Sequence, residues 1–145
     1  MSLPRPLRRL AAMALVAAVA LSACRRDSAC RVPAGEATFS LYPDEATYHA
    51  LNIVGGYEYF VGGHRGVVVV RTQQDAFVAY ERSCPLDTNT QVSVSADLGS
   101  AVLECPKCHS RFSTFTDGVP LQGSATPCSL FQYSTMYDGD RLYVY

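Results

Sequence analysis

The stretch that decides the fold of this chain reads Cys105-Pro106-Lys107-Cys108-His109-Ser110-Arg111-Phe112. Another cysteine precedes it by 21 residues, in Ser83-Cys84-Pro85-Leu86-Asp87. Proteins commonly bind a metal ion or an iron-sulfur cluster through cysteine sulfurs on two separate turns. The sequence therefore predicts two ligand loops that meet in space, with Cys84, Cys105 and Cys108 as metal ligands.

The residues around these motifs have the pattern of an all-β protein. Short apolar or alternating runs recur between turn residues, as is typical of strands. We expect nine strands, over residues 39–42, 57–61, 67–71, 76–82, 92–96, 101–104, 111–115, 130–137 and 142–145. One or two helical turns are expected over 44–51, because Asp44 and Glu45 follow Pro43 in the order that a helix start prefers.

From Cys105 onward the sequence resembles the second half of a Rieske-type [2Fe-2S] domain. The resemblance rests on Cys105-Pro106, Ser110, Phe112, Asp117-Gly118, Gly123-Ser124-Ala125, Leu130, Tyr133 and the closing run 138–144. It spans roughly residues 57 to 145. It implies an all-β, Rieske-like antiparallel sheet sandwich, in which two ligand loops hold the cluster beneath a third, covering loop.

Both histidine ligands of that family are absent from this chain. By the resemblance, Cys84 and Cys105 match the two cysteine ligands, whereas Leu86 and Cys108 stand where the histidines belong. The resemblance therefore implies a metal centre with altered ligands. The high reduction potential that histidine ligation confers would be lost with the histidines.

A fourth ligand is needed beside the three sulfurs, and the sequence offers Cys128, Asp87 or His109. If the covering loop 123–128 lies over the cluster, as the resemblance implies, Cys128 gives a four-thiolate [2Fe-2S] centre with a potential on the order of −400 mV. Asp87 instead gives a Cys-x-x-Asp pair followed by a Cys-x-x-Cys pair, which is the spacing of a zinc ribbon with one carboxylate ligand. Ser110 keeps the family serine whose hydroxyl would donate to a sulfur.

The N-terminus predicts export and a lipid anchor. Three arginines precede an uncharged apolar run from Leu10 to Ala23, which is shorter than the ~20 residues that a membrane span needs. The run ends in Leu21-Ser22-Ala23-Cys24, which resembles a lipobox, with cleavage before Cys24 and acylation of that cysteine. We expect a signal peptide over 1–23, a tether over 24–36 and a Rieske-like domain over 37–145. This domain would be anchored to a membrane of the bacterial cell envelope, outside the cytoplasm.

Two further interpretations of the cysteines stay open. The residues from Cys105 to His109 satisfy C-x-x-C-H, the attachment signature of c-type haem, although they lie between predicted strands in a chain with little helix. An exported chain can also form disulfides, in which Cys84 would pair with a cysteine of the second loop and Cys30 with Cys128. A domain held by zinc or by disulfides is therefore the alternative to an electron carrier.

Charge and motif content exclude several functions. After removal of the signal peptide, nine basic residues face thirteen acidic ones, which leaves a formal charge of about −4 and no basic stripe. A nucleic-acid role has no support. A stand-alone enzyme is not supported either, because the sequence offers neither a Ser-His-Asp arrangement nor a Gly-rich phosphate loop. The sequence thus favours one-electron transfer with a redox partner, and the structural or interaction module is the competing hypothesis.

Overall fold

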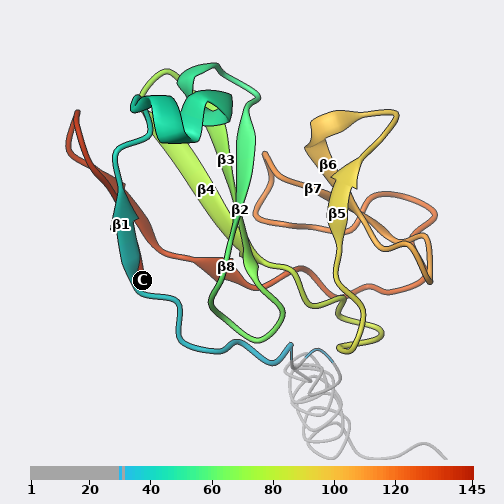
Figure 1. Cartoon of the computed structure of the whole chain (residues 1–145). Helices are drawn as coiled ribbons and strands as arrows, with labels where there is room; N and C mark the ends of the chain where they lie inside the picture. The colour runs from blue at the N-terminus through green and yellow to red at the C-terminus, as the bar shows by residue number, and fades with distance from the viewer. Residues whose placement is uncertain (1–29, 31) are drawn as a thin grey trace, which may run out of the picture.

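The computed structural model describes Cys30 and residues 32–145. The expected signal peptide, the lipidation site Cys24 and most of the expected tether therefore lie outside the described residues. Within the described part of the chain, ten strands form three antiparallel sheets beside one 3₁₀ helix (Figure 1). This confirms the all-β fold class that the sequence predicts. No helix among these residues is long and apolar enough to cross a membrane.

The strands are β1 (Phe39–Leu41), β2 (Tyr57–Phe60), β3 (Val67–Gln73), β4 (Ala76–Glu81), β5 (Ser93–Ser95), β6 (Gly99–Glu104), β7 (Arg111–Ser113), β8 (Gln132–Tyr133), β9 (Thr135–Tyr137) and β10 (Leu142–Val144). Their order in the three sheets is β1-β10-β9, β2-β3-β4-β8 and β5-β6-β7. The expected helical turns are found as the 3₁₀ helix η2 (Ala46–Asn52).

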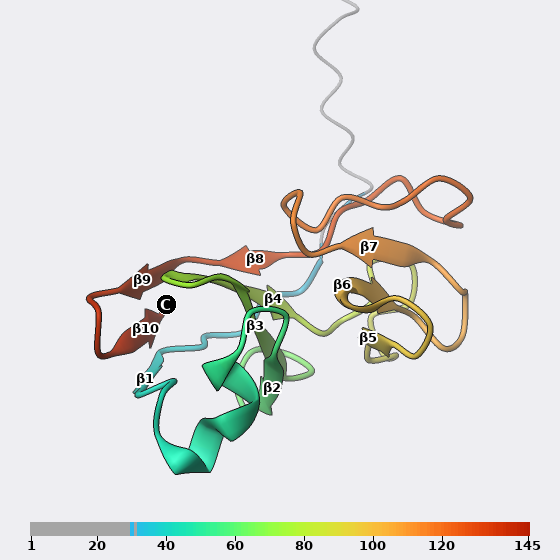
Figure 2. The same cartoon turned by 90° about the horizontal axis from the view of Figure 1, so that it is seen from above.

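The four-stranded sheet β2-β3-β4-β8 stands between the other two and is covered on both faces (Figure 2). Residues 67–70 of β3 are fully buried valines. Because successive side chains of a strand point to opposite faces, Val67 and Val69 pack in one core and Val68 and Val70 in another. A strand covered on both sides has no solvent face, so its sequence is a continuous apolar run rather than an alternating one.

The first core lies between the four-stranded sheet and the sheet β1-β10-β9. It consists of Ala37, Leu41, Leu51, Val67, Val69, Phe77, Ala79, Tyr133, Leu142 and Val144. Leu51 is the buried residue of η2, and its burial holds this short helix against the sheets. The first core is thus built from aliphatic and aromatic side chains.

The second core lies on the other face of the four-stranded sheet, toward β5-β6-β7. It consists of Val68, Val70, Tyr80, Cys84, Val92, Leu103, Cys105, Phe112 and Leu130. The hydroxyl of Tyr80 donates to the carbonyl of Thr114 at 3.0 Å. Burial raises the pKa of Tyr80 to about 12, so this side chain stays neutral and satisfied inside the core. Two of the predicted metal ligands, Cys84 and Cys105, are therefore core residues.

The predicted strand over 130–137 is in fact two strands. β8 pairs with β4, whereas β9 pairs with β10 in a different sheet. Ser134 lies between them and exchanges two backbone hydrogen bonds with Tyr145, at 2.9 and 3.1 Å. The chain passes from one sheet to the other at this residue, which the local sequence pattern does not reveal. The other eight predicted strands are present with ends shifted by at most two residues.

The last residues of the expected tether lie against the domain. The carbonyl of Glu36 accepts a hydrogen bond from the amide of Gly63 at 3.1 Å. The carbonyl oxygen of Gly35 lies 3.1 Å from the hydroxyl oxygen of Tyr133. A side chain at Gly35 would overlap the backbone of Gly63, so the close approach requires glycine. Residues 35 and 36 are therefore part of the packed domain rather than of a free linker.

Candidate metal centre

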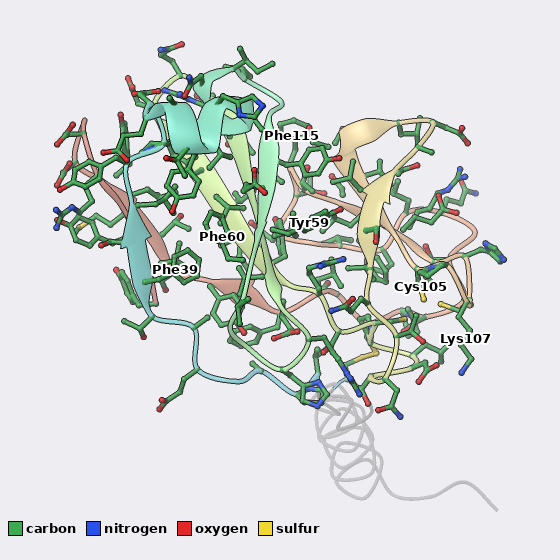
Figure 3. The ribbon with its side chains drawn as sticks, viewed as in Figure 1. Phe39, Tyr59, Phe60, Cys105, Lys107 and Phe115 are labelled. Atoms are coloured by element: carbon green, nitrogen blue, oxygen red, sulfur yellow. A yellow bond between two sulfur atoms is a disulfide. The ribbon has the colours of Figure 1, made fainter. Side chains whose placement is uncertain are left out.

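Three cysteine sulfurs from two loops meet beside the third sheet. Cys84 follows β4, and Cys105 and Cys108 lie in the turn between β6 and β7. The three Sγ atoms all lie within 4.8 Å of one another. The Sγ atoms of Cys84 and Cys108 are 3.6 Å apart, and all three cysteines are free thiols. Figure 3 labels Cys105 and Lys107 close together, with sulfur atoms beside them, on the opposite side of the molecule from Phe39.

A tight backbone turn presents the two cysteines of the second loop. The amide of Cys105 donates to the carbonyl of Ser110, and the amide of His109 donates to the carbonyl of Cys105, both at 3.0 Å. His109 has a left-handed φ of 56°. Residues other than glycine rarely adopt this backbone conformation, so the turn is a tight one. The segment is a turn between strands, whereas the haem-attachment interpretation expects the start of a helix.

The first loop folds back on itself around Cys84. The amide of Cys84 donates to the carbonyl of Thr90 at 2.9 Å, and the amide of Thr90 donates to the carbonyl of Asp87 at 2.9 Å. The backbone amides of Leu86 and Asp87 act on Cys84 in the direction that lowers the pKa of its thiol. Amides that face a sulfur stabilise the thiolate that a metal needs.

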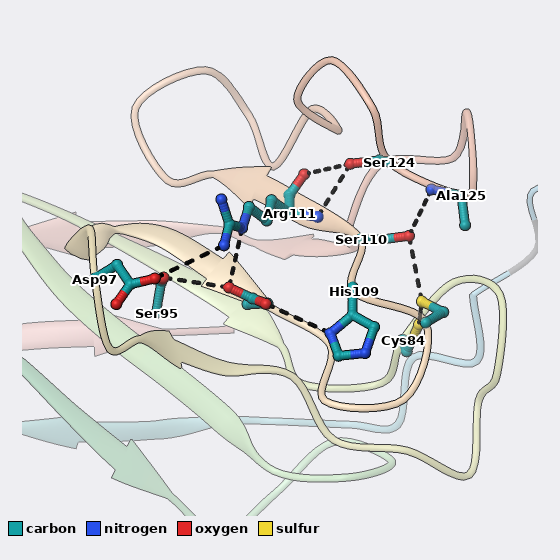
Figure 4. A network of polar contacts seen from close by, with 10 residues as sticks. Cys84, Ser95, Asp97, His109, Ser110, Arg111, Ser124 and Ala125 are labelled. Atoms are coloured by element: carbon teal, nitrogen blue, oxygen red, sulfur yellow. Dashed lines mark hydrogen bonds and ion pairs between the residues drawn. The ribbon is translucent and has the colours of Figure 1, made fainter.

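Ser110 links the second loop to the covering loop. Its hydroxyl oxygen lies 3.2 Å from the Sγ of Cys108 and accepts a hydrogen bond from the amide of Ala125 at 3.0 Å (Figure 4). Ser110 is fully buried. When Cys108 is a thiolate, the hydroxyl of Ser110 is free to donate to it, because the amide of Ala125 already uses the hydroxyl as an acceptor.

Cys128 does not join the three sulfurs, which corrects its place among the candidate ligands. It forms a disulfide with Cys30, which is 98 residues away in the sequence. A cysteine in a disulfide has no thiolate to offer a metal. The structure therefore contains the Cys30–Cys128 pair that the sequence allowed as an alternative, while Cys84, Cys105 and Cys108 stay reduced.

His109 faces away from the sulfurs. Its side chain is 76% exposed, and its Nδ1 lies 3.7 Å from a carboxylate oxygen of Glu104. Figure 4 shows His109 and Ser110 on opposite sides of the turn, with only Ser110 linked to a sulfur. In this conformation His109 does not complete the centre.

Asp87 is the remaining candidate for the fourth ligand, and it lies between the two ligand loops. Its carboxylate accepts a hydrogen bond from the hydroxyl of Thr90 at 2.8 Å and contacts the ammonium of Lys107. Lys107 belongs to the second loop, between the two cysteines, so this ion pair joins the loops. The pair with Lys107 lowers the pKa of Asp87, which keeps the carboxylate charged. Asp87 is thus linked to both cysteine loops through Thr90 and Lys107, although its carboxylate is not among the atoms that lie within 4.8 Å of one another.

The environments of Cys84 and Cys108 push their pKa values in opposite directions. Burial raises the pKa of Cys84 to about 12. Burial acts in the same direction on Cys108, but hydrogen bonds from the hydroxyl and amide of Ser110 outweigh it and lower the pKa of this thiol. A metal ion that binds here must therefore displace a proton from a buried thiol.

A buried carboxylate that sequence reasoning missed positions the first ligand loop. Glu81 is fully buried and accepts hydrogen bonds from the amides of His64, Arg65 and Ser83 and from the hydroxyls of Ser83 and Tyr133, at 2.7 to 3.0 Å. Burial would raise the pKa of Glu81, but these hydrogen bonds outweigh it and lower the pKa. Because Glu81 lies three residues before Cys84, its network fixes the direction in which the chain enters the centre.

No protein-family model matches the chain, and no curated protein matches it. Among solved structures, the chain is similar to the ferredoxin of carbazole 1,9a-dioxygenase from Nocardioides aromaticivorans IC177. The two share 22% sequence identity with a TM-score of 0.47, over 63% of this chain and 86% of that chain. A likeness of this size says nothing of ligands or activity, so the function rests on the residues of the centre itself.

Proposed function

We propose that this chain is a membrane-anchored, Rieske-like metal-binding protein that exchanges single electrons with a partner through a thiolate-bound metal centre. The observation that carries the proposal is the convergence of three free thiols from two loops within 4.8 Å of one another. The same chain holds another cysteine pair as a disulfide. Thiols that stay reduced and close together in a chain that forms disulfides are best explained as metal ligands.

The usual Rieske ligand set does not fit this chain. A Rieske [2Fe-2S] cluster takes two cysteines on one iron and two histidines on the other. Leu86 stands at the first histidine position, and its 54% exposed aliphatic side chain has no donor atom. Cys108 stands at the second, 3.6 Å from Cys84. The proposed electron transfer therefore belongs to a centre with altered ligands, and not to a histidine-ligated cluster.

The disulfide supports a specific placement of the proposed membrane anchor. Cys128 belongs to the covering loop, in which Ala125 donates to Ser110 beside the sulfur of Cys108. Six residue steps separate Cys24 from Cys30. A fully extended chain of that length reaches about 20 Å. If Cys24 is acylated, the disulfide holds the metal end of the domain within this reach of the membrane surface, which suits a redox partner in or on the membrane.

The surface beside the centre is suited to a protein contact. Cys108 is the partly exposed member of the three cysteines, so it places the metal near the surface. Leu86 offers an exposed apolar side chain from the neighbouring loop. Apolar side chains become buried at the core of a protein interface. A metal ion at the edge of that interface would lie close to the redox group of the partner.

A redox titration of the whole chain, extracted from membranes without oxygen, tests the proposal. We expect a reversible one-electron transition in the visible spectrum, and loss of this transition in Cys108→Ser. The acylation-deficient variant Cys24→Ala should keep the transition and leave the membrane fraction. A colourless protein without any reversible transition would contradict electron transfer.

A structural or interaction module held by zinc is the second candidate. The approach of Asp87 to the cysteine loops favours it, because three thiolates and one carboxylate are a zinc donor set and zinc has no redox chemistry of its own. Stoichiometric zinc in the protein as isolated from its native cells, with no iron, would support this module in place of the electron carrier. In that case the domain would bind a partner through its surface at the membrane, without electron transfer.

A further inference from the structure

The distance between the Sγ atoms of Cys84 and Cys108 bears on the number of metal ions that the centre would hold. The Rieske resemblance implies that Cys84 matches a ligand of one iron of a two-iron cluster and Cys108 a ligand of the other. Ligands of different irons stand at opposite ends of such a cluster. In a tetrahedral site with metal–sulfur bonds of about 2.3 Å, two sulfurs on the same ion are about 3.8 Å apart. The Sγ atoms of Cys84 and Cys108 are 3.6 Å apart, a contact between two thiols that one shared ion could occupy with little movement of either sulfur.

We infer that the centre binds a single thiophilic metal ion, held by the thiolates of Cys84, Cys105 and Cys108 and by the carboxylate of Asp87. This inference rests on the metal-binding part of the proposed function and specifies its centre. The third sulfur agrees with it, because all three Sγ atoms lie within 4.8 Å of one another. Three sulfurs at such distances can occupy three corners of one tetrahedron.

We assign the fourth corner to Asp87 because it is tied to both loops, and its carboxylate would leave Lys107 to reach the ion. Asp87 lies three residues after Cys84 in the same turn, where its carbonyl accepts a hydrogen bond from the amide of Thr90 at 2.9 Å. Its carboxylate contacts Lys107, which lies between Cys105 and Cys108 in the second loop. Lys107 is 69% exposed and can turn to solvent when the carboxylate binds the ion. The other candidates, Cys128 and His109, are held elsewhere by the disulfide and by Glu104.

The donor set selects the kind of ion. Soft thiolates favour zinc and similar ions over magnesium or calcium, and a tetrahedral sulfur-rich site suits zinc, cobalt(II) or iron(II). Binding replaces three S–H bonds by three metal–sulfur bonds and releases three protons, while the carboxylate of Asp87 is already charged. Binding leaves the ion divalent, so this step needs no oxidant or reductant. The positive charge of Lys107 partly offsets the negative charge of the loaded centre.

Cobalt(II) titration of the whole, detergent-extracted chain tests the inference, after metal removal with a chelator under reducing conditions without oxygen. We expect saturation at one cobalt ion per chain, with the intense visible bands of a tetrahedral ion and a sulfur-to-cobalt charge-transfer band. Added zinc should displace the cobalt one for one. The same preparation, before metal removal, should contain no acid-labile sulfide.

The outcomes separate this inference from the proposed function. Two irons and two labile sulfides per chain would overturn the single ion and leave the metal centre standing. Absence of any metal in the isolated protein, together with no cobalt binding, would overturn both. A weak octahedral cobalt spectrum would overturn the three-thiolate site.

Two substitutions of Asp87 test the fourth ligand, with Asp97→Asn as the matched control because Asp97 is exposed and lies in a different turn. Asp87→Asn should weaken cobalt binding by about 10-fold or more. Loss of a residue that only hydrogen-bonds to a metal ligand already weakens binding by about 10-fold, and loss of a ligand should weaken it at least as much. Asp87→Cys should restore tight binding and strengthen the charge-transfer band, because a fourth thiolate joins the ion. Unchanged affinity and spectra in both variants would remove Asp87 from the centre.

Discussion

The two cores on either side of the four-stranded sheet differ in what holds them together. The first core consists mainly of apolar and aromatic side chains and is flanked by the stacked rings of Phe39 and Phe60, whose centroids are 4.8 Å apart. The buried guanidinium of Arg71 adds a hydrogen bond to the carbonyl of Leu51. The second core includes the sulfurs of Cys84 and Cys105 and is bounded by three short strands. One half of the domain is therefore held mainly by packing, whereas the stability of the other half also depends on what its thiols bind.

Metal removal should produce the largest difference between the two cores. At a free metal concentration one thousand times the Kd, binding stabilises the folded state by about 4 kcal/mol. A chelator should therefore speed amide hydrogen exchange in β6 and β7 while the amides of Val67 and Val69 in β3 stay protected. Equal loss of protection in all three sheets would contradict two independently stabilised cores.

A matched pair of leucine truncations tests whether only the second core affects metal binding. Leu142 in the first core and Leu103 in the second are both fully buried, so Leu142→Ala and Leu103→Ala should each cost roughly 3 to 4 kcal/mol in the free energy of unfolding. Urea denaturation at saturating zinc measures both. Only Leu103→Ala should also weaken metal binding, and an equal loss of metal affinity in Leu142→Ala would break the distinction.

The disulfide can be removed without touching the three free thiols. The double variant Cys30→Ser/Cys128→Ser removes a cross-link between residues that are 98 apart in the sequence. Its loss should lower the free energy of unfolding by about 3 kcal/mol. The metal-to-protein ratio should not change, because neither cysteine is a ligand in this account. Loss of metal from a variant that remains folded, as judged by circular dichroism, would return Cys128 to the ligand set.

The smallest expected effect comes from Glu81, which joins the two cores through its hydrogen bonds to Tyr133 and Ser83. Its pKa is lower in the folded protein than in the unfolded chain, so its contribution is present at neutral pH and is lost as the pH falls through the folded pKa. Glu81→Gln should cost about 2 kcal/mol at pH 7. The difference from wild type should shrink in acid.

Thermal unfolding from pH 7 down to acid pH measures this effect, with Glu45→Gln as the control because Glu45 is exposed. A difference between Glu81→Gln and wild type that stays constant with pH would contradict a charged, hydrogen-bonded Glu81.

The strands were predictable because their pattern follows from local burial. The four valines at 67–70 are apolar on both faces because both faces are covered, and that pattern is visible in the sequence. The split of the strand over 130–137 was not visible, because it depends on which sheet each half joins. Pairing between distant strands is a tertiary property that residue types alone do not encode.

The centre was predictable only in part. The spacing of Cys84, Cys105 and Cys108 indicated two ligand loops, and the structure brings these three sulfurs together. The partner of Cys128 could not be chosen, because a pairing across 98 residues depends on where the tether packs. Glu81 gave no signal at all, since it looks like the polar end of an ordinary strand, and its burial becomes clear only once the amides of His64 and Arg65 face it.

The metal-to-protein ratio of the whole chain, purified without oxygen, tests the central claim most directly. We predict one metal ion per chain in the wild type, less than a tenth of that in Cys108→Ser, and an unchanged ratio in Cys30→Ser/Cys128→Ser. A wild-type protein without metal, or a Cys108→Ser variant that keeps its metal, would contradict the claim that Cys84, Cys105 and Cys108 form a metal centre.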